Sequence, residues 1–170
     1  MSPSSVENEL IAQAIFRINE NTERIEKCLE ALDEEDLWKK PNSTLNSVGN
    51  LILHLCGNIG QYIIASLGGN PDTRVRDEEF SASGGRTKAE LLAQLKATTE
   101  SAKAIISRQE AGSLTRSRHV QAYQLTGTGI ILHVVEHYSY HTGQIAFWTK
   151  LLKEKDLGFY AGINLNQKNS

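Results

Sequence analysis

Residues 130–152 read IILHVVEHYSYHTGQIAFWTKLL, and this stretch decides the fold. Its apolar side chains recur at helical spacing and cover much of the helical circumference, which is typical of a helix at the centre of a bundle. The same stretch carries three of the chain's five histidines, His133, His137 and His141, each four residues from the next. The pattern predicts a central helix near residues 128–154 with a row of imidazoles along it.

Three other segments have the spacing of apolar residues that an amphipathic helix requires, and they lie near 6–32, 47–68 and 87–110. The last of these begins with a capping box that runs from Thr87 to Glu90. The sequence therefore predicts an all-α protein, a four-helix bundle that forms a single domain over residues 1–170.

The segments between these helices are polar. The link over residues 70–86 is rich in turn residues and long enough to cross along the length of a bundle. A second link contains residues 118–125, which can be extended, but the chain has no convincing pair of strands. Residues 155–170 are expected to form a loosely held tail.

Composition limits the classes of function. The chain has 170 residues, of which 39% are hydrophobic and 22% charged, as in an ordinary soluble globular protein. A formal net charge of −2 gives no broad basic field, which argues against a nucleic-acid partner. No apolar run approaches the ~20 residues of a membrane span, and no secretory signal is visible. Two cysteines, Cys28 and Cys56, lack a framework spacing, so we expect a cytoplasmic protein.

The histidines of the last helix can form a metal site in two ways. Side chains four residues apart nearly eclipse on a helix, so two imidazoles so placed can bind one ion. His133 and His141 cannot easily share an ion, because eight residues separate their Cα atoms by about 12 Å along the axis. His137 must therefore pair with one or the other.

In the first version His133 pairs with His137, and Glu136 is the general base. The string His-x-x-Glu-His is the inverted zinc-peptidase motif. Such enzymes take their third ligand from an acidic residue well downstream on another helix. Here only Glu154 and Asp156 follow, at or beyond the end of the same helix, so this version is weakly supported.

In the second version His137 pairs with His141 and recruits His54 from the segment 47–68. Asn50 and Asn58 lie four residues before and after His54, and Gln144 lies about one turn beyond His141. These amides are candidates for second-sphere or substrate contacts. A third reading has the histidines as hydrogen-bonded core residues with no metal. The acidic run Asp77-Glu78-Glu79 is expected to be a solvated face.

Two stretches together resemble a known family. Residues 50–58, NLILHLCGN, and residues 133–145, HVVEHYSYHTGQI, are similar to the DinB/YfiT-like superfamily of metal-binding four-helix proteins. The resemblance implies an up-down-down-up bundle and a metal held by His54, His137 and His141, with His133 as a buried neighbour. It also implies zinc or nickel as the ion and a homodimer as the assembly.

The resemblance implies several kinds of activity. Some members of the superfamily are thiol-S-transferases that use a low-molecular-weight thiol such as bacillithiol or mycothiol, and others are isomerases. This chain is most similar to a bacterial subgroup of unassigned activity. Three histidines on one ion are compatible with a metal-dependent transferase or hydrolase that acts on a small molecule, and the resemblance alone favours the thiol-transferase version. No catalytic base can be assigned, because Glu136 lies about 100° round the helix from His137. The alternative is a non-catalytic metal-binding or stress-response module.

Overall fold

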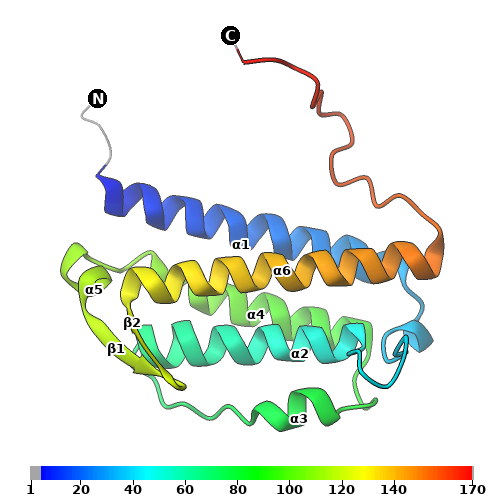
Figure 1. Ribbon diagram of the computed structural model, residues 1–170, viewed down its shortest axis with the longest axis horizontal. Helices are drawn as coiled ribbons and strands as arrows, with labels where there is room; N and C mark the ends of the chain where they lie inside the picture. The colour runs from blue at the N-terminus through cyan, green and yellow to red at the C-terminus, as the bar shows by residue number, and fades with distance from the viewer. Residues whose placement is uncertain (1–4, 170) are drawn as a thin grey trace.

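Four long helices form a bundle in the computed structural model, which describes residues 5–169 (Figure 1). They are α1 (Val6–Ala31), α2 (Val48–Ile59), α4 (Lys88–Ile106) and α6 (Gly127–Lys153). α1 and α6 run in one direction, and α2 and α4 run in the other. Each helix packs against two of the others, α1 against α4 and α6, and α2 against α4 and α6. The predicted all-α, up-down-down-up bundle is confirmed.

Side-chain caps fix where these helices begin. Ser47 accepts a hydrogen bond from the backbone N–H of Asn50, and the Asn50 side chain accepts one in return from the backbone N–H of Ser47. Thr87 and Glu90 form the predicted capping box of α4. Thr126 accepts from the N–H of Gly129 at the start of α6. Such caps satisfy N–H groups that have no partner within the helix.

The core lies between the four helices and is aliphatic. Its fully buried side chains include Ile18 and Ile25 of α1, Ile52 and Leu55 of α2, Leu91 and Leu95 of α4, and Ile130 and Ile145 of α6. A polar contact also crosses this core: the hydroxyls of Thr22 and Tyr138 lie 2.8 Å apart and join α1 to α6. Burial of these apolar side chains supplies most of the favourable free energy of folding, because that free energy scales with the apolar area removed from water.

The ends of α1 and α6 are joined by an ionic cluster. After α1, a short 3₁₀ helix (Glu34–Asp36) places the buried carboxylate of Asp36 between the ammonium groups of Lys39 and Lys153. Burial raises the pKa of Asp36, but the hydrogen bonds from the two lysines and from the Asp33 N–H outweigh it and hold that pKa well below its ordinary value. The carboxylate therefore stays charged and anchors the α1–α2 connection.

The second helix differs from the prediction in two respects. Its backbone changes after Ile59 into a π-helical segment, Gly60–Leu67, which ends at the Gly68-Gly69 pair. The whole stretch Val48–Leu67 is also long and apolar enough to cross a membrane by length and composition, contrary to the sequence estimate. Within its most apolar 18 residues, 72% is buried inside the bundle, as in the core helix of a soluble protein.

Both long links contain structure that the sequence pattern did not predict. The link over 70–86 includes a short helix, α3 (Arg76–Ser81), and α4 ends at Ile106 instead of near residue 110. The second link holds α5 (Ala111–Thr115) and a hairpin of β1 (Ser117–Val120) and β2 (Tyr123–Thr126). The expectation of no strand pair was wrong. The hairpin turn is Gln121-Ala122, which lacks the Asn-Gly or Asp-Gly signal of such turns, and Gln121 adopts a positive φ of 51°.

The first residues of the tail after α6 contact the bundle. Leu157 is buried against the bundle, and the guanidinium of Arg24 lies over the rings of Phe159 and Tyr160. Beyond these residues the chain extends away from the bundle (Figure 1).

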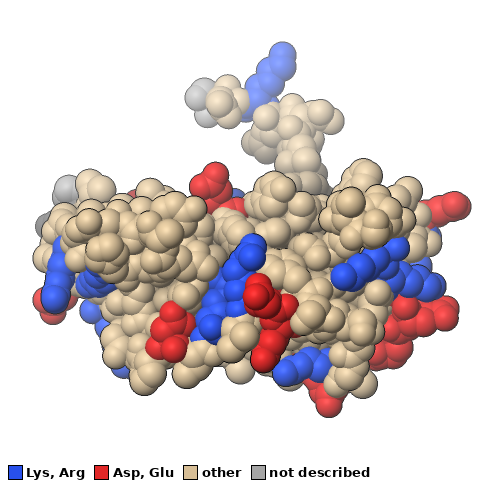
Figure 2. Space-filling view, turned by 60° about the horizontal axis from the view of Figure 1, so that its bottom comes forward, with Lys and Arg blue, Asp and Glu red and all other residues tan. Residues whose placement is uncertain are grey.

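On the face that includes α3, acidic and basic side chains are interspersed (Figure 2), so this face carries no broad field of one sign.

Candidate metal centre

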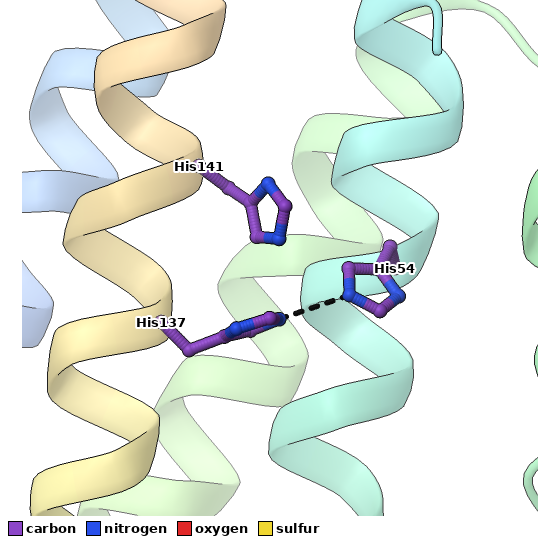
Figure 3. A group of neighbouring side chains, drawn as sticks. All are labelled: His54, His137 and His141. Carbon is purple, nitrogen blue, oxygen red and sulfur yellow. Dashed lines mark hydrogen bonds between the residues drawn. The ribbon is translucent and has the colours of Figure 1, made fainter. Parts of the chain in front are cut away.

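Three histidines from two helices point toward one another in the middle of the bundle. α2 carries His54, and α6 carries His137 and His141 one turn apart (Figure 3). One ring nitrogen of each lies within 4.8 Å of those of the other two, and the Nε2 atoms of His54 and His137 are 2.9 Å apart. The ring centroids are separated by 4.4 to 5.0 Å. This triangle is a fitting set of donors for a metal ion.

The outer nitrogen of His141 is bound to an amide. His141 Nδ1 lies 2.7 Å from the Oε1 atom of Gln144, and the Gln144 amide donates in turn to the hydroxyl of Tyr140 at 3.1 Å. Since a carbonyl oxygen only accepts, Nδ1 carries the hydrogen and Nε2 keeps its lone pair. Gln144 is thus a direct partner of one candidate ligand.

The outer nitrogen of His54 meets a charged pair from the link after α2. His54 Nδ1 lies 2.8 Å from Glu79 Oε2, and Arg74 donates to both oxygens of that carboxylate, from Nε at 2.7 Å and from its terminal nitrogen at 2.9 Å. Glu79 is only 8% exposed. Burial raises its pKa, but the hydrogen bonds from Arg74 and His54 outweigh that effect and lower it, so Glu79 is ionised.

His133 lies beside the triangle and not in it. Its ring stacks on Tyr62 at a centroid distance of 4.1 Å and on His137 at 5.4 Å, and its Nε2 lies 3.2 Å from the amide nitrogen of Asn58. The hydroxyl of Tyr62 donates to Gln121 in the hairpin turn, which holds the stack from outside. His133 is a half-buried neighbour of the site.

An open cavity of about 550 Å³ lies at the outer edge of the triangle. It is lined by His133, Glu136, His137, Ser139 and Tyr140, and the Glu136 side chain is exposed there. A molecule in this cavity therefore reaches His137 directly.

Asn50 lies under the link after α2 and does not face a cavity in which a substrate could bind. Its side chain is fully buried. Its oxygen accepts from Ser47, and its NH2 group donates to the backbone carbonyls of Glu79 at 2.9 Å and Ala82 at 2.7 Å. Of the two roles expected for Asn50, a second-sphere contact or a substrate contact, the contacts exclude a direct one to substrate, because its hydrogen-bonding groups are used to hold the link that carries Glu79.

Comparison with known proteins identifies the family. A family model described as "Protein of unknown function (DUF1572)" matches residues 5–162, which is nearly the whole chain. The chain belongs to the DUF1572 family. A search of curated proteins gives no match.

Solved structures of low sequence identity share the fold of this DUF1572 protein. A conserved protein from Enterococcus faecalis is 16% identical, with a TM-score of 0.72 over 85% of this chain and 97% of its own. The DinB-like protein YjoA from Bacillus subtilis is 19% identical, with a TM-score of 0.64 over 88% and 94%. A DinB-like protein from Bacillus cereus is 14% identical, with a TM-score of 0.63 over 79% and 87%. The predicted resemblance to DinB-like proteins is confirmed for the fold.

The electrostatic surroundings favour neutral imidazoles in this DUF1572 site. Burial, together with the neighbouring His141 and His54, lowers the pKa of His137 to about 3. Burial also lowers the pKa values of His133 and His141. Neutral imidazoles offer lone pairs to a cation, so the donor set fits a divalent metal ion.

These shifts predict how the stability of the metal-free protein depends on pH. The pKa of a histidine in the unfolded chain is 6.5, whereas that of His137 in the folded protein is about 3. Between these values the unfolded form binds more protons, so stability is expected to fall as the pH drops below about 6.5. Urea unfolding at about pH 7.5 and pH 5 measures this fall, and His137→Gln should reduce it. An equal fall in both proteins would contradict the prediction.

The sequence reading missed the charged partners of His54. It treated the run Asp77-Glu78-Glu79 as a solvated face, which holds for Asp77 and Glu78 but is wrong for Glu79. The error has a tertiary cause, because the contact joins residues 25 positions apart through a link with no periodic pattern. One local signal is Gly57, three residues after His54, which marks a close approach of another segment to α2.

Proposed function

We propose that this protein binds a divalent ion, zinc or nickel, through His54, His137 and His141 and acts with it on a small molecule. The reaction is a transfer of the thiol-S-transferase type or a hydrolysis. The observation that carries the proposal is the triangle of imidazole nitrogens within 4.8 Å of one another at the edge of an open cavity. Three protein ligands are the number at which catalytic zinc sites keep a position for water or substrate.

The residues around the triangle have distinct tasks under this proposal. A bound ion would lower the pKa of a water molecule or a thiol in the cavity. His133, which is neutral, and the exposed carboxylate of Glu136 line the same cavity and can accept the proton that the water or thiol releases. Gln144 orients His141, and Asn58 together with Tyr62 orients His133.

The size and surroundings of the cavity support a small substrate. About 550 Å³ lies within the range of ordinary small-molecule sites, roughly 300–1,000 Å³. Tyr140 also borders a second, more apolar groove of about 510 Å³, which includes Leu45, Phe147 and Leu151. A substrate bound at His137 can therefore extend an apolar part past Tyr140.

A cytoplasmic location and a homodimer belong to the same proposal. Cys28 and Cys56 are free and buried, which is consistent with a reducing compartment. Large apolar side chains stay exposed along α6, among them Leu132, Phe147 and Leu151, and exposed apolar patches often mark contacts between proteins.

Assays with and without metal test the activity. Protein loaded with Zn²⁺ or Ni²⁺ is screened for thiol conjugation, with bacillithiol and mycothiol among the thiols, and for ester and amide hydrolysis. Turnover is expected only in the metal-loaded protein, and His137→Ala should remove it. Turnover that His137→Ala leaves unchanged would overturn the proposed site. Stoichiometric metal without any turnover would favour the non-catalytic metal-binding module.

A further inference from the structure

We propose that Glu79 is a positioning residue of the metal centre: its carboxylate fixes the tautomer and orientation of His54, and Arg74 fixes the carboxylate. The inference rests on the proposed metal site and goes beyond its three ligands to a second layer contributed by the link over residues 70–86. The consequence is that metal affinity depends on a residue that never touches the ion.

The first step is the position of the proton on His54. Two groups approach Nδ1, the Glu79 carboxylate at 2.8 Å and a terminal nitrogen of Arg74 at 3.1 Å. The carboxylate can only accept and the guanidinium can only donate. Because the carboxylate is the nearer and would otherwise face a lone pair, Nδ1 carries the hydrogen and donates to Glu79. Nε2 is then the unprotonated nitrogen, and it is the atom 2.9 Å from His137 Nε2.

The second step is the rigidity of Glu79 itself. Arg74 binds both of its oxygens, and the Arg74 side chain is only 4% exposed and donates also to Gln61. Asn50 holds the backbone carbonyls of Glu79 and Ala82. Side-chain and backbone contacts therefore fix the carboxylate from two directions, and its geometry toward His54 cannot vary freely.

The third step is the fit between the link and α2. A Cβ atom at Gly57 would lie 1.9 Å from Glu79 Oε1 and 2.9 Å from Arg74 Nε. The ion pair thus occupies the space that a side chain at this position of α2 would fill. The close approach puts Glu79 within hydrogen-bond reach of His54, one helical turn before Gly57 in the same helix.

The fourth step is the difference between the two oriented ligands. His141 is held by the amide of Gln144, whereas His54 is held by a carboxylate that Arg74 binds through both oxygens. An anionic partner strengthens the basicity of an imidazole ligand more than an amide does, and loss of such outer partners typically lowers metal affinity by about 10–100-fold.

The test measures zinc affinity by competition with a chromogenic chelator and needs no enzymatic activity. Glu79→Ala is expected to weaken Zn²⁺ binding about 10–100-fold, whereas Glu78→Ala, the exposed neighbour, should leave it unchanged. Glu79→Ala leaves Arg74 buried without its partner, which can unfold the link. The double variant Arg74→Leu/Glu79→Leu removes both charges and should show the same loss of affinity.

A spectroscopic measurement separates positioning from a general loss of structure. In metal-free protein labelled with ¹⁵N-histidine, His54 should be the Nδ1–H tautomer in the native chain and a mixture of tautomers in the double variant. Zinc affinity within about threefold of native in both Glu79 variants, with zinc bound normally by the native protein, would overturn the inference. Absence of zinc binding by the native protein would instead overturn the proposed function.

Discussion

Replacement of His54 by alanine is expected to abolish the stabilisation of this protein by zinc. A ligand that binds only the folded state adds about 2.7 kcal/mol when its free concentration is 100 times Kd. For a chain of 170 residues this corresponds to a rise in Tm of roughly 5–10 °C. His54→Ala removes the ligand that α2 contributes, and two imidazoles on α6 cannot replace it. The rise should therefore fall below about 1 °C, as measured by thermal unfolding with and without Zn²⁺.

His133→Ala is the matched control for this experiment. The residue lies on the same helix as two candidate ligands and contacts His137, but it belongs to the stack with Tyr62 and not to the triangle. His133→Ala should therefore keep most of the stabilisation by zinc, although its Tm without metal is expected to be lower. The reverse outcome, with zinc stabilisation lost in His133→Ala and kept in His54→Ala, would favour the His-x-x-Glu-His version of the site.

The sequence could predict those parts of the site that depend on helical periodicity. The four-residue spacing of His137 and His141 places both on one face of α6, independently of how the rest of the chain folds. His54 stands in an equally strong apolar pattern, so a second helix and its orientation toward the core were also predictable. These are local properties, which is why the long helices lie close to their expected ranges.

The parts that the sequence could not predict depend on contacts between distant segments. Arg74 and Glu79 stand in a polar link, where one charged residue looks like any other until the link folds onto α2. The amide of Asn50 lies four residues before His54 and therefore suggested a site residue, yet it points to the backbone of this link. The π-helical segment after Ile59 likewise has no distinctive pattern, because the same apolar residues fit an α-helix.

Gly57→Ala is expected to destabilise the protein although alanine is the better helix former. In an exposed helix the change would gain up to about 1 kcal/mol. Here the new methyl group would overlap Glu79 Oε1, which lies 1.9 Å from the Cβ position, so the buried Arg74–Glu79 pair must move or separate. Disruption of a buried pair typically costs about 3–5 kcal/mol, which leaves a net loss of roughly 2–4 kcal/mol in the free energy of unfolding.

Gly60→Ala provides the matched control in the same stretch of helix. Within residues 5–169, no atom outside the adjoining helix backbone lies within 4 Å of the position that a Cβ at Gly60 would take, and its φ of −55° is helical, so this change should be neutral or slightly stabilising. Urea unfolding of the two variants compares them directly, and zinc competition should show weaker binding in Gly57→Ala alone. If Gly57→Ala were as stable as Gly60→Ala, the Arg74–Glu79 pair could leave α2 at no cost. The contact between Glu79 and His54 would then be too weak to orient a metal ligand.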